Sequence, residues 1–125
     1  MSQEIALVYN LKEERLQKVR SVLMFLGIRV REVKAAEYGI PIGELITNTT
    51  NVEGDAGETF SEEMMVLSVA PNRIDALIQR FRRHKIALPT LTAVLTETNA
   101  QWDSIALAAE LRQEREAIMQ GKTEH

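Results

Sequence analysis

Hydrophobic residues follow two periodicities along the chain, and their order predicts two strand–helix–strand halves followed by a last helix. The runs 4–10 and 64–70 are apolar at successive positions, which is typical of strands buried on both faces. Residues 28–36 alternate between apolar and charged side chains, and residues 88–96 read as a fourth strand. We therefore predict an α+β fold, a ferredoxin-like β-α-β-β-α-β sandwich with one antiparallel sheet and two helices on one face.

Three segments carry apolar residues at three- and four-residue steps, the spacing of amphipathic helices. The first, 12–26, ends before Gly27, which fits a helix C-cap. The second begins around Pro71, with Asn72 as the expected N-cap. The third, 99–120, is additional to a ferredoxin-like unit, so it covers the other face of the sheet, lies along an edge or reaches a partner.

A long acidic loop is predicted at 37–63, between the second and third strands. The stretch 35–72 contains seven acidic residues and no Lys or Arg, so its charges repel one another and favour a solvated, mobile segment. One or two helical turns can begin at Pro41. Four residues match positions of a calcium-binding loop, namely Asn51, Glu53, Asp55 and Glu62. We predict no metal site, because Ala56 stands where that loop requires glycine and Glu58 where it requires an apolar residue.

Composition fits one domain, which we place at residues 1–120, with a frayed tail at 121–125. The chain has 125 residues, 45% of them hydrophobic, and no cysteine, which excludes disulfides, zinc–thiolate sites and thiol catalysis. We expect a cytoplasmic protein, because neither a signal peptide nor a membrane-spanning run is visible. The net charge of −3 makes nucleic acid an unlikely partner.

The turn at 96–102 is the strongest local candidate for a ligand site. Two hydroxyls, an amide and an indole precede a helix and could hold a small anion or a polar ligand. The residues concerned are Thr96, Thr98, Asn99 and Trp102. A structural interpretation competes with this one, in which Thr98 or Asn99 caps the helix and Trp102 packs on the sheet.

A basic patch closes the second predicted helix. Its members are Arg80, Arg82, Arg83 and Lys85. Cations at a helix C-terminus interact favourably with the helix dipole, which accounts for them without a ligand. RNA binding is not expected, because the strand 64–70 offers no aromatic side chain on which a base could stack. We predict no catalytic residues and no cofactor, because neither His84 nor His125 has a nucleophile or ligand at a suitable spacing.

The segment 93–102, AVLTETNAQW, resembles a small bacterial family, domain-of-unknown-function family 3783, through its T-x-T-N-x-x-W pattern. The segment 42–46, IGELI, and the apolar strand before Asn72 resemble other recurrent pieces of that family. The resemblance supports the fold and supplies no catalytic residue, because the family has no assigned activity. A looser topological likeness links the long loop to the PII nitrogen-signalling proteins, ferredoxin-like trimers that bind nucleotide in subunit clefts. Their phosphate-binding glycine and basic motifs are not found here.

These patterns lead us to expect a non-enzymatic regulatory or protein-interaction domain of the bacterial cytoplasm, acting as a homo-oligomer or with a protein partner. Strands that are apolar on both faces need cover on both, and only two helices are assured for one face. The last helix or another chain must cover the second. Two alternatives stay open: a domain that senses a nucleotide or metabolite at the 96–102 turn, and an enzyme with an unrecognised site.

Overall fold

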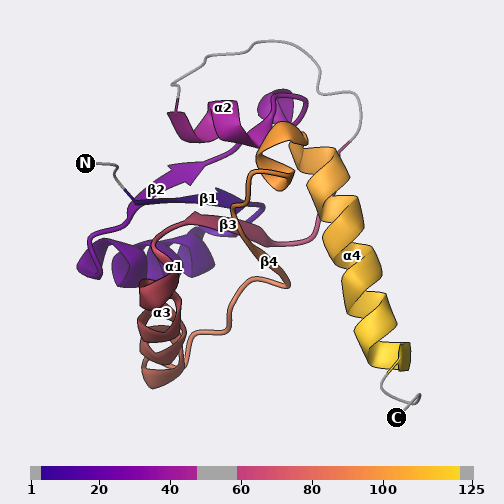
Figure 1. Ribbon diagram of the computed structural model, residues 1–125. Helices are drawn as coiled ribbons and strands as arrows, with labels where there is room; N and C mark the ends of the chain where they lie inside the picture. The colour runs from indigo at the N-terminus through magenta and orange to yellow at the C-terminus, as the bar shows by residue number, and fades with distance from the viewer. Residues whose placement is uncertain (1–3, 48–58, 122–125) are drawn as a thin grey trace.

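A four-stranded sheet lies between two helical layers in the computed structural model, which describes residues 4–47 and 59–121 (Figure 1). The strands are β1 (Ile5–Tyr9), β2 (Arg29–Glu32), β3 (Met64–Ser68) and β4 (Leu91–Val94). The helices are α1 (Glu13–Phe25), α2 (Ile42–Thr47), α3 (Pro71–Arg83) and α4 (Ser104–Gly121), with 3₁₀ turns η1 (Ala35–Glu37) and η2 (Asn99–Gln101). Within 4–47 and 59–121, no helix combines the length and the apolar character that crossing a membrane requires.

The strand order is β2-β1-β3-β4, which corrects the predicted ferredoxin-like arrangement. β1 pairs in parallel with β2, β3 pairs in parallel with β4, and β1 meets β3 antiparallel. The mixed sheet therefore replaces the predicted antiparallel one, and each β-α-β half keeps its two strands adjacent instead of interleaving them with the other half. Both topologies share the same order of elements along the chain, so the hydrophobic pattern cannot separate them.

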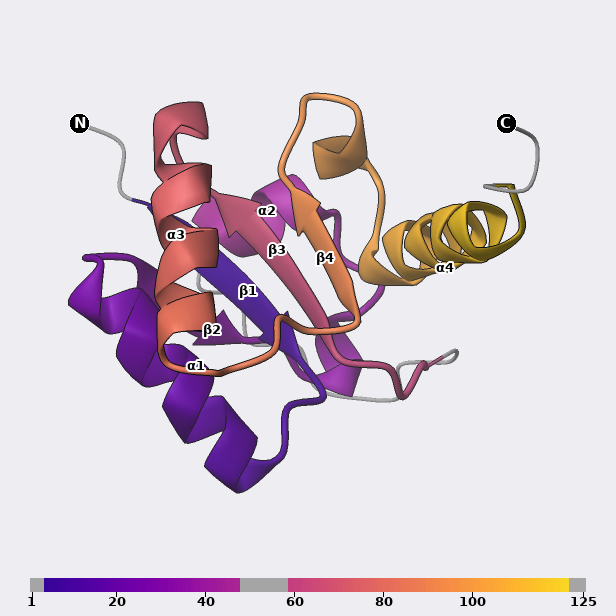
Figure 2. The ribbon, with the colours of Figure 1, turned by 90° about the horizontal axis from the view of Figure 1, so that it is seen from below.

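Both faces of the sheet are covered, each by different helices (Figure 2). All five residues of β1 are buried, as the unbroken apolar run predicts. Met65 of β3 faces α1 and α3, and packs in one core with Leu23 and Phe81. Met64 faces the opposite layer, where it shares a second core with Leu45 of α2 and Leu107 of α4. The last helix and α2 thus supply the cover that the sequence required for the second face.

Helices α1 and α3 end in the same way, with one residue in the left-handed region. After α1 this residue is Gly27 at φ 79°, and the amide of Ile28 donates to the carbonyl of Leu23 over 2.9 Å. The prediction that Gly27 ends the helix is confirmed. After α3 the equivalent residue is Lys85 at φ 58°, where a side chain costs about 1–2 kcal/mol.

The described part of the predicted loop contains helical turns, and the second strand is shorter than predicted. β2 stops at Glu32, and residues 35–47 form η1 and α2 instead of strand and loop. The carboxylate of Glu37 accepts from the Arg31 guanidinium over 2.5 Å and from the Lys34 amide over 3.1 Å, so η1 is tied to β2. The helical turns predicted at Pro41 are confirmed as α2. The calcium-loop positions Asn51, Glu53, Asp55, Ala56 and Glu58 lie outside the described residues.

The start of α3 differs from the sequence prediction. Ala70 precedes the helix and Pro71 is its first residue, while Asn72 is exposed and does not cap. The Glu4 carboxylate accepts instead from the Ala70 amide over 2.9 Å. The Glu4 bond reaches the amide of the residue before the helix, so no side chain takes the capping role predicted for Asn72. Of the predicted tail 121–125, Gly121 ends α4 and the rest lies outside the described residues.

Candidate interaction surface

The first turn of α4 is fixed by buried hydrogen bonds. The hydroxyls of Tyr9, at the end of β1, and Ser104 lie 2.8 Å apart, and both side chains are fully buried. The Ser104 amide donates to the carbonyl of Tyr38 over 3.0 Å. Asp103 caps the helix, because its Oδ1 accepts from the Ala106 amide over 2.8 Å. Burial raises the pKa of the Tyr9 phenol, so that hydroxyl stays protonated across the physiological range.

An aromatic cluster packs Phe60 against the end of β1 and the residue that follows η1. The rings of Tyr38 and Phe60 stack with centroids 4.7 Å apart, and the Tyr9 ring lies 5.7 Å from each. Asn10 adds a polar clamp, since its Nδ2 donates to the Phe60 carbonyl over 2.9 Å and its Oδ1 accepts from the Tyr38 hydroxyl over 3.2 Å. Burial raises the pKa of Tyr38, and the bond to Asn10 opposes that rise.

The predicted ligand turn is held together by its own polar groups. The buried Asn99 side chain accepts from the Thr96 amide over 2.8 Å and donates to the Val94 carbonyl over 3.1 Å. In return, the Asn99 amide donates to the Thr96 hydroxyl over 3.0 Å. Thr98 is exposed, and Trp102 is half-buried against the core beside α2. The structure thus brings Thr96 and Asn99 together to shape η2, and Asp103 rather than Thr98 or Asn99 caps α4.

The buried stripe of α4 ends partway along the helix. Leu107 and Leu111 pack in the core beneath α2. At the next residue, the Arg112 guanidinium donates to the Glu62 carboxylate, with 2.6 Å between Nε and Oε2. This bond holds the pKa of Glu62 below its ordinary value and raises that of Arg112. Residues 113–118 are all exposed, and Figure 1 shows this end of α4 extending away from the sheet.

The exposed end of α4 continues the same helix face that is buried earlier. Glu114 and Ile118 follow Leu107 by seven and eleven residues, which is about two and three helical turns. They therefore lie on the side of α4 that carries Leu107 and Leu111. Ile118 is nonetheless 71% exposed. We call Glu114 and Ile118 the distal stripe: it has the position of a core stripe, but within residues 4–47 and 59–118 no core covers it.

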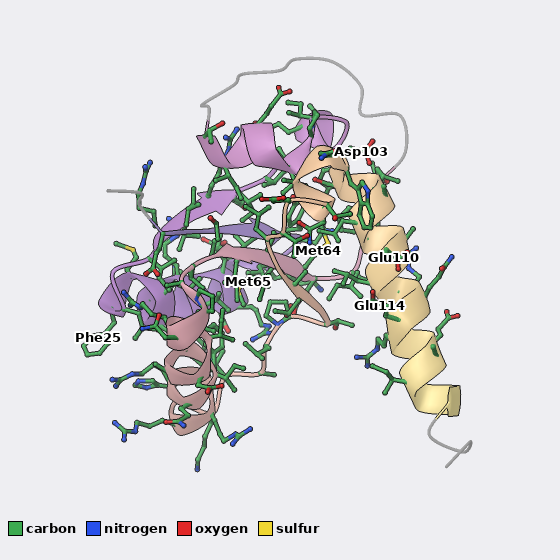
Figure 3. All side chains as sticks on the ribbon, viewed as in Figure 1. Phe25, Met64, Met65, Asp103, Glu110 and Glu114 are labelled. Atoms are coloured by element: carbon green, nitrogen blue, oxygen red, sulfur yellow. The ribbon has the colours of Figure 1, made fainter. Side chains whose placement is uncertain are left out.

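A second apolar surface lies at the end of α1. Met24 and Phe25 are 62% and 71% exposed, and the Arg80 guanidinium lies 4.6 Å from the centroid of the Phe25 ring. Arg20 and Met24 line a shallow depression of about 420 Å³ beside β2. We call Arg20, Met24, Phe25 and Arg80 the Phe25 patch. Figure 3 shows Phe25 and Glu114 on opposite sides of the molecule.

Of the predicted basic patch, Arg80 belongs to the Phe25 patch, whereas Arg82, Arg83 and Lys85 are exposed on and just beyond the last turn of α3. Sequence reasoning missed Met24 and Phe25. The signal was present, because the stripe through Val19 and Leu23 leaves these two positions on the sides of α1 turned away from the core.

The two layers also differ in charge. Residues 12–25 and 71–85, which contain α1 and α3, hold nine Lys or Arg and three Asp or Glu. The described residues of the other layer, in 35–47, 59–63 and 97–118, hold nine Asp or Glu and two Arg. The sheet therefore separates a basic layer from an acidic one.

A polar depression of about 600 Å³ lies at the start of α3. It is lined by Glu4, Gly27, Arg29, Ser68, Val69, Ala70 and Arg73. The Glu4 carboxylate occupies the helix N-terminus, because it bonds to the Ala70 amide and forms a 2.9 Å ion pair with Arg73. The anion position that a helix start offers is therefore filled by the chain itself.

The segment from residue 63 to residue 118 matches the model of a family described as Domain of unknown function (DUF3783). This segment contains β3, α3, β4, η2 and α4 as far as the distal stripe. The resemblance inferred from the T-x-T-N-x-x-W pattern is thus confirmed, and the likeness to PII proteins is not. No curated protein and no solved structure matches the chain significantly.

Proposed function

We propose that the chain is a non-enzymatic protein-interaction domain, because residues 63–118 match the DUF3783 family model and this segment ends in the exposed half of α4. The exposed end of α4 is its binding element, and the cytoplasm is its proposed site of action. One observation carries the proposal: the core face of α4 continues into the distal stripe, where Ile118 is exposed. An apolar residue at a core position that the rest of the described chain leaves exposed is suited to contact another surface.

The way α4 is mounted supports this role. Its first turn is held by the bond between Tyr9 and Ser104 and by the Asp103 cap, while its second half is free of the sheet. A helix that is rigid at its base presents its outer residues in a fixed orientation, which reduces the entropy lost on binding. The sensing alternative is less well supported, because the polar groups of Thr96 and Asn99 are already bonded to each other or to the backbone.

Site-specific photo-crosslinking tests the proposal. A photoreactive amino acid replaces Ile118 in the full chain, in living cells, and the matched control places it at Glu116, which lies on the opposite side of α4. We expect a discrete crosslinked species from position 118 that position 116 does not give. Equal crosslinking from both positions, or none from 118, would refute the proposal.

A shortened chain separates binding from folding. Ending the chain at Gln113 removes the distal stripe and leaves Leu107, Leu111 and the Arg112 ion pair in place. Because the removed side chains described by the structure are exposed, the free energy of unfolding should change by less than about 0.5 kcal/mol. The partner captured through position 118 should no longer bind the shortened chain in a pull-down assay.

A further inference from the structure

We propose that the distal stripe of one copy docks on the Phe25 patch of a second copy, so that the chain associates head to tail. The inference rests on the proposed function and names the partner of the same helix. Its first support is the match between the two surfaces. The distal stripe presents one apolar residue and one acid, Ile118 and Glu114, while the patch presents apolar Phe25 beside the cation Arg80.

The spacing within the two surfaces is also compatible. Ile118 and Glu114 are four residues apart on one helix face, which places them about 6 Å apart along the axis. In the patch, the Arg80 guanidinium lies 4.6 Å from the centre of the Phe25 ring. The guanidinium lies over one face of the ring, so an isoleucine packed against the ring edge beside it would bring the acid near the guanidinium. Met24, at 62% exposure, widens the apolar part of the patch.

The charge of the two layers favours the same pairing. The Phe25 patch lies in the basic layer, with nine cations against three acids, and α4 lies in the acidic layer, with nine acids against two cations. Two copies that bring like layers together repel each other, whereas a basic layer facing an acidic layer attracts. A second copy of this chain thus supplies both the apolar and the electrostatic complement of the distal stripe.

The position of the two surfaces determines the kind of assembly. They lie on opposite sides of the molecule, so each copy can donate its α4 to one neighbour and accept α4 from another (Figure 3). Such a heterologous contact builds a closed ring or an open chain rather than a simple two-fold dimer. We therefore expect masses above that of a dimer at high protein concentration.

Charge reversal provides the decisive experiment. The mass of the full chain is measured by analytical ultracentrifugation over a range of concentrations, at low salt and at about 0.5 M NaCl, where exposed charges are largely screened. The Glu114→Lys and Arg80→Glu variants should each weaken self-association about tenfold or more. The matched controls Glu116→Lys and Arg82→Glu make the same charge changes away from the two surfaces and should have a much smaller effect.

Mixing the two disabled variants tests the head-to-tail geometry. A Glu114→Lys chain keeps its Phe25 patch, and an Arg80→Glu chain keeps its distal stripe. Each should associate weakly alone, and the mixture should regain association. At one contact the native stripe meets the native patch, and at the other the two reversed charges attract each other. Circular dichroism of each variant verifies folding, which is expected because Glu114 is exposed and Arg80 lies outside the core.

The inference is overturned if the wild-type chain stays monomeric at low salt, if Glu116→Lys weakens association as much as Glu114→Lys, or if the mixed variants do not associate. Failure of this inference can be told from failure of the proposed function. A monomeric chain whose position 118 still crosslinks to a different protein in cells refutes self-association alone. A chain that does neither refutes both.

Discussion

The buried contact between Tyr9 and Ser104 should be worth more to the protein than its single hydrogen bond suggests. Both side chains are fully buried, and their oxygens are 2.8 Å apart. Replacing Tyr9 by Phe leaves the Ser104 hydroxyl in the core without its partner, and Ser104→Ala leaves the Tyr9 phenol in the same position. Stranding a buried polar group costs about 1–3 kcal/mol, so each substitution should lower the free energy of unfolding by that amount.

The double variant distinguishes this explanation from a simple loss of packing. With both hydroxyls removed no polar group is stranded, so the double variant should lose clearly less than the sum of the two single losses. The difference should be about 1–2 kcal/mol, as is usual for residues in direct contact. Tyr38→Phe is the matched control, because the Tyr38 hydroxyl donates to Asn10, an exposed residue that water can satisfy instead.

Urea denaturation provides the measurement. Trp102 is the one tryptophan of the chain and lies two residues before Ser104, so its fluorescence follows this region, while circular dichroism follows the whole fold. With a denaturant slope of about 1–3 kcal/mol per molar urea, a single variant should lower the midpoint by roughly 1 M. Single losses below about 0.5 kcal/mol, or a double loss equal to the sum, would contradict the explanation.

Three further predictions concern other contacts. Asn99→Ala should lower the free energy of unfolding by about 1–3 kcal/mol in urea titrations, because it strands two backbone groups, whereas Thr98→Ala on the same turn should change it by less than about 0.5 kcal/mol. Lys85→Gly should raise the free energy of unfolding by about 1 kcal/mol, because Lys85 has φ 58°, a conformation that glycine adopts without strain. A variant with an unchanged thermal midpoint would contradict this explanation. The Glu62 pair with Arg112 should contribute at most about 1 kcal/mol, since both side chains are about one-third exposed. The folded-state pKa of Glu62 is lowered from 4.5, so the contribution of the pair to stability is complete above pH 4.5 and is lost as the pH falls through the lowered pKa. If the loss of unfolding free energy in Glu62→Gln stays constant in acid, this explanation is refuted.

The elements of the fold follow from the sequence more closely than their arrangement does. The apolar runs 4–10 and 64–70 predict buried strands, because burial on both faces leaves no polar position, and both are central in the sheet. The order of the strands depends on where the strand that follows each helix joins the sheet. That choice is made by long-range packing between the halves, which has no local pattern, so the ferredoxin-like order was wrong.

In the candidate surface, too, the sequence predicts local elements but not how they pack. The T-x-T-N-x-x-W pattern indicates a polar turn before a helix, and the turn is there, with Asn99 at its centre. The cap at Asp103 could not be predicted from that pattern, because η2 inserts one extra turn before α4 begins. The apolar positions Leu111 and Ile118 look equivalent in sequence. Only the extent of the core beneath α4 shows that the first is half-buried and the second exposed.

The antiparallel meeting of β1 and β3 has a consequence for where this fold can hold a small molecule. In doubly wound parallel sheets all strands finish at one edge, and ligands settle in the crevice that opens there between outward-turning loops. Here β1 and β2 finish at one edge of the sheet, and β3 and β4 finish at the other. The loops that would jointly form such a crevice are thereby divided between opposite rims of the sheet.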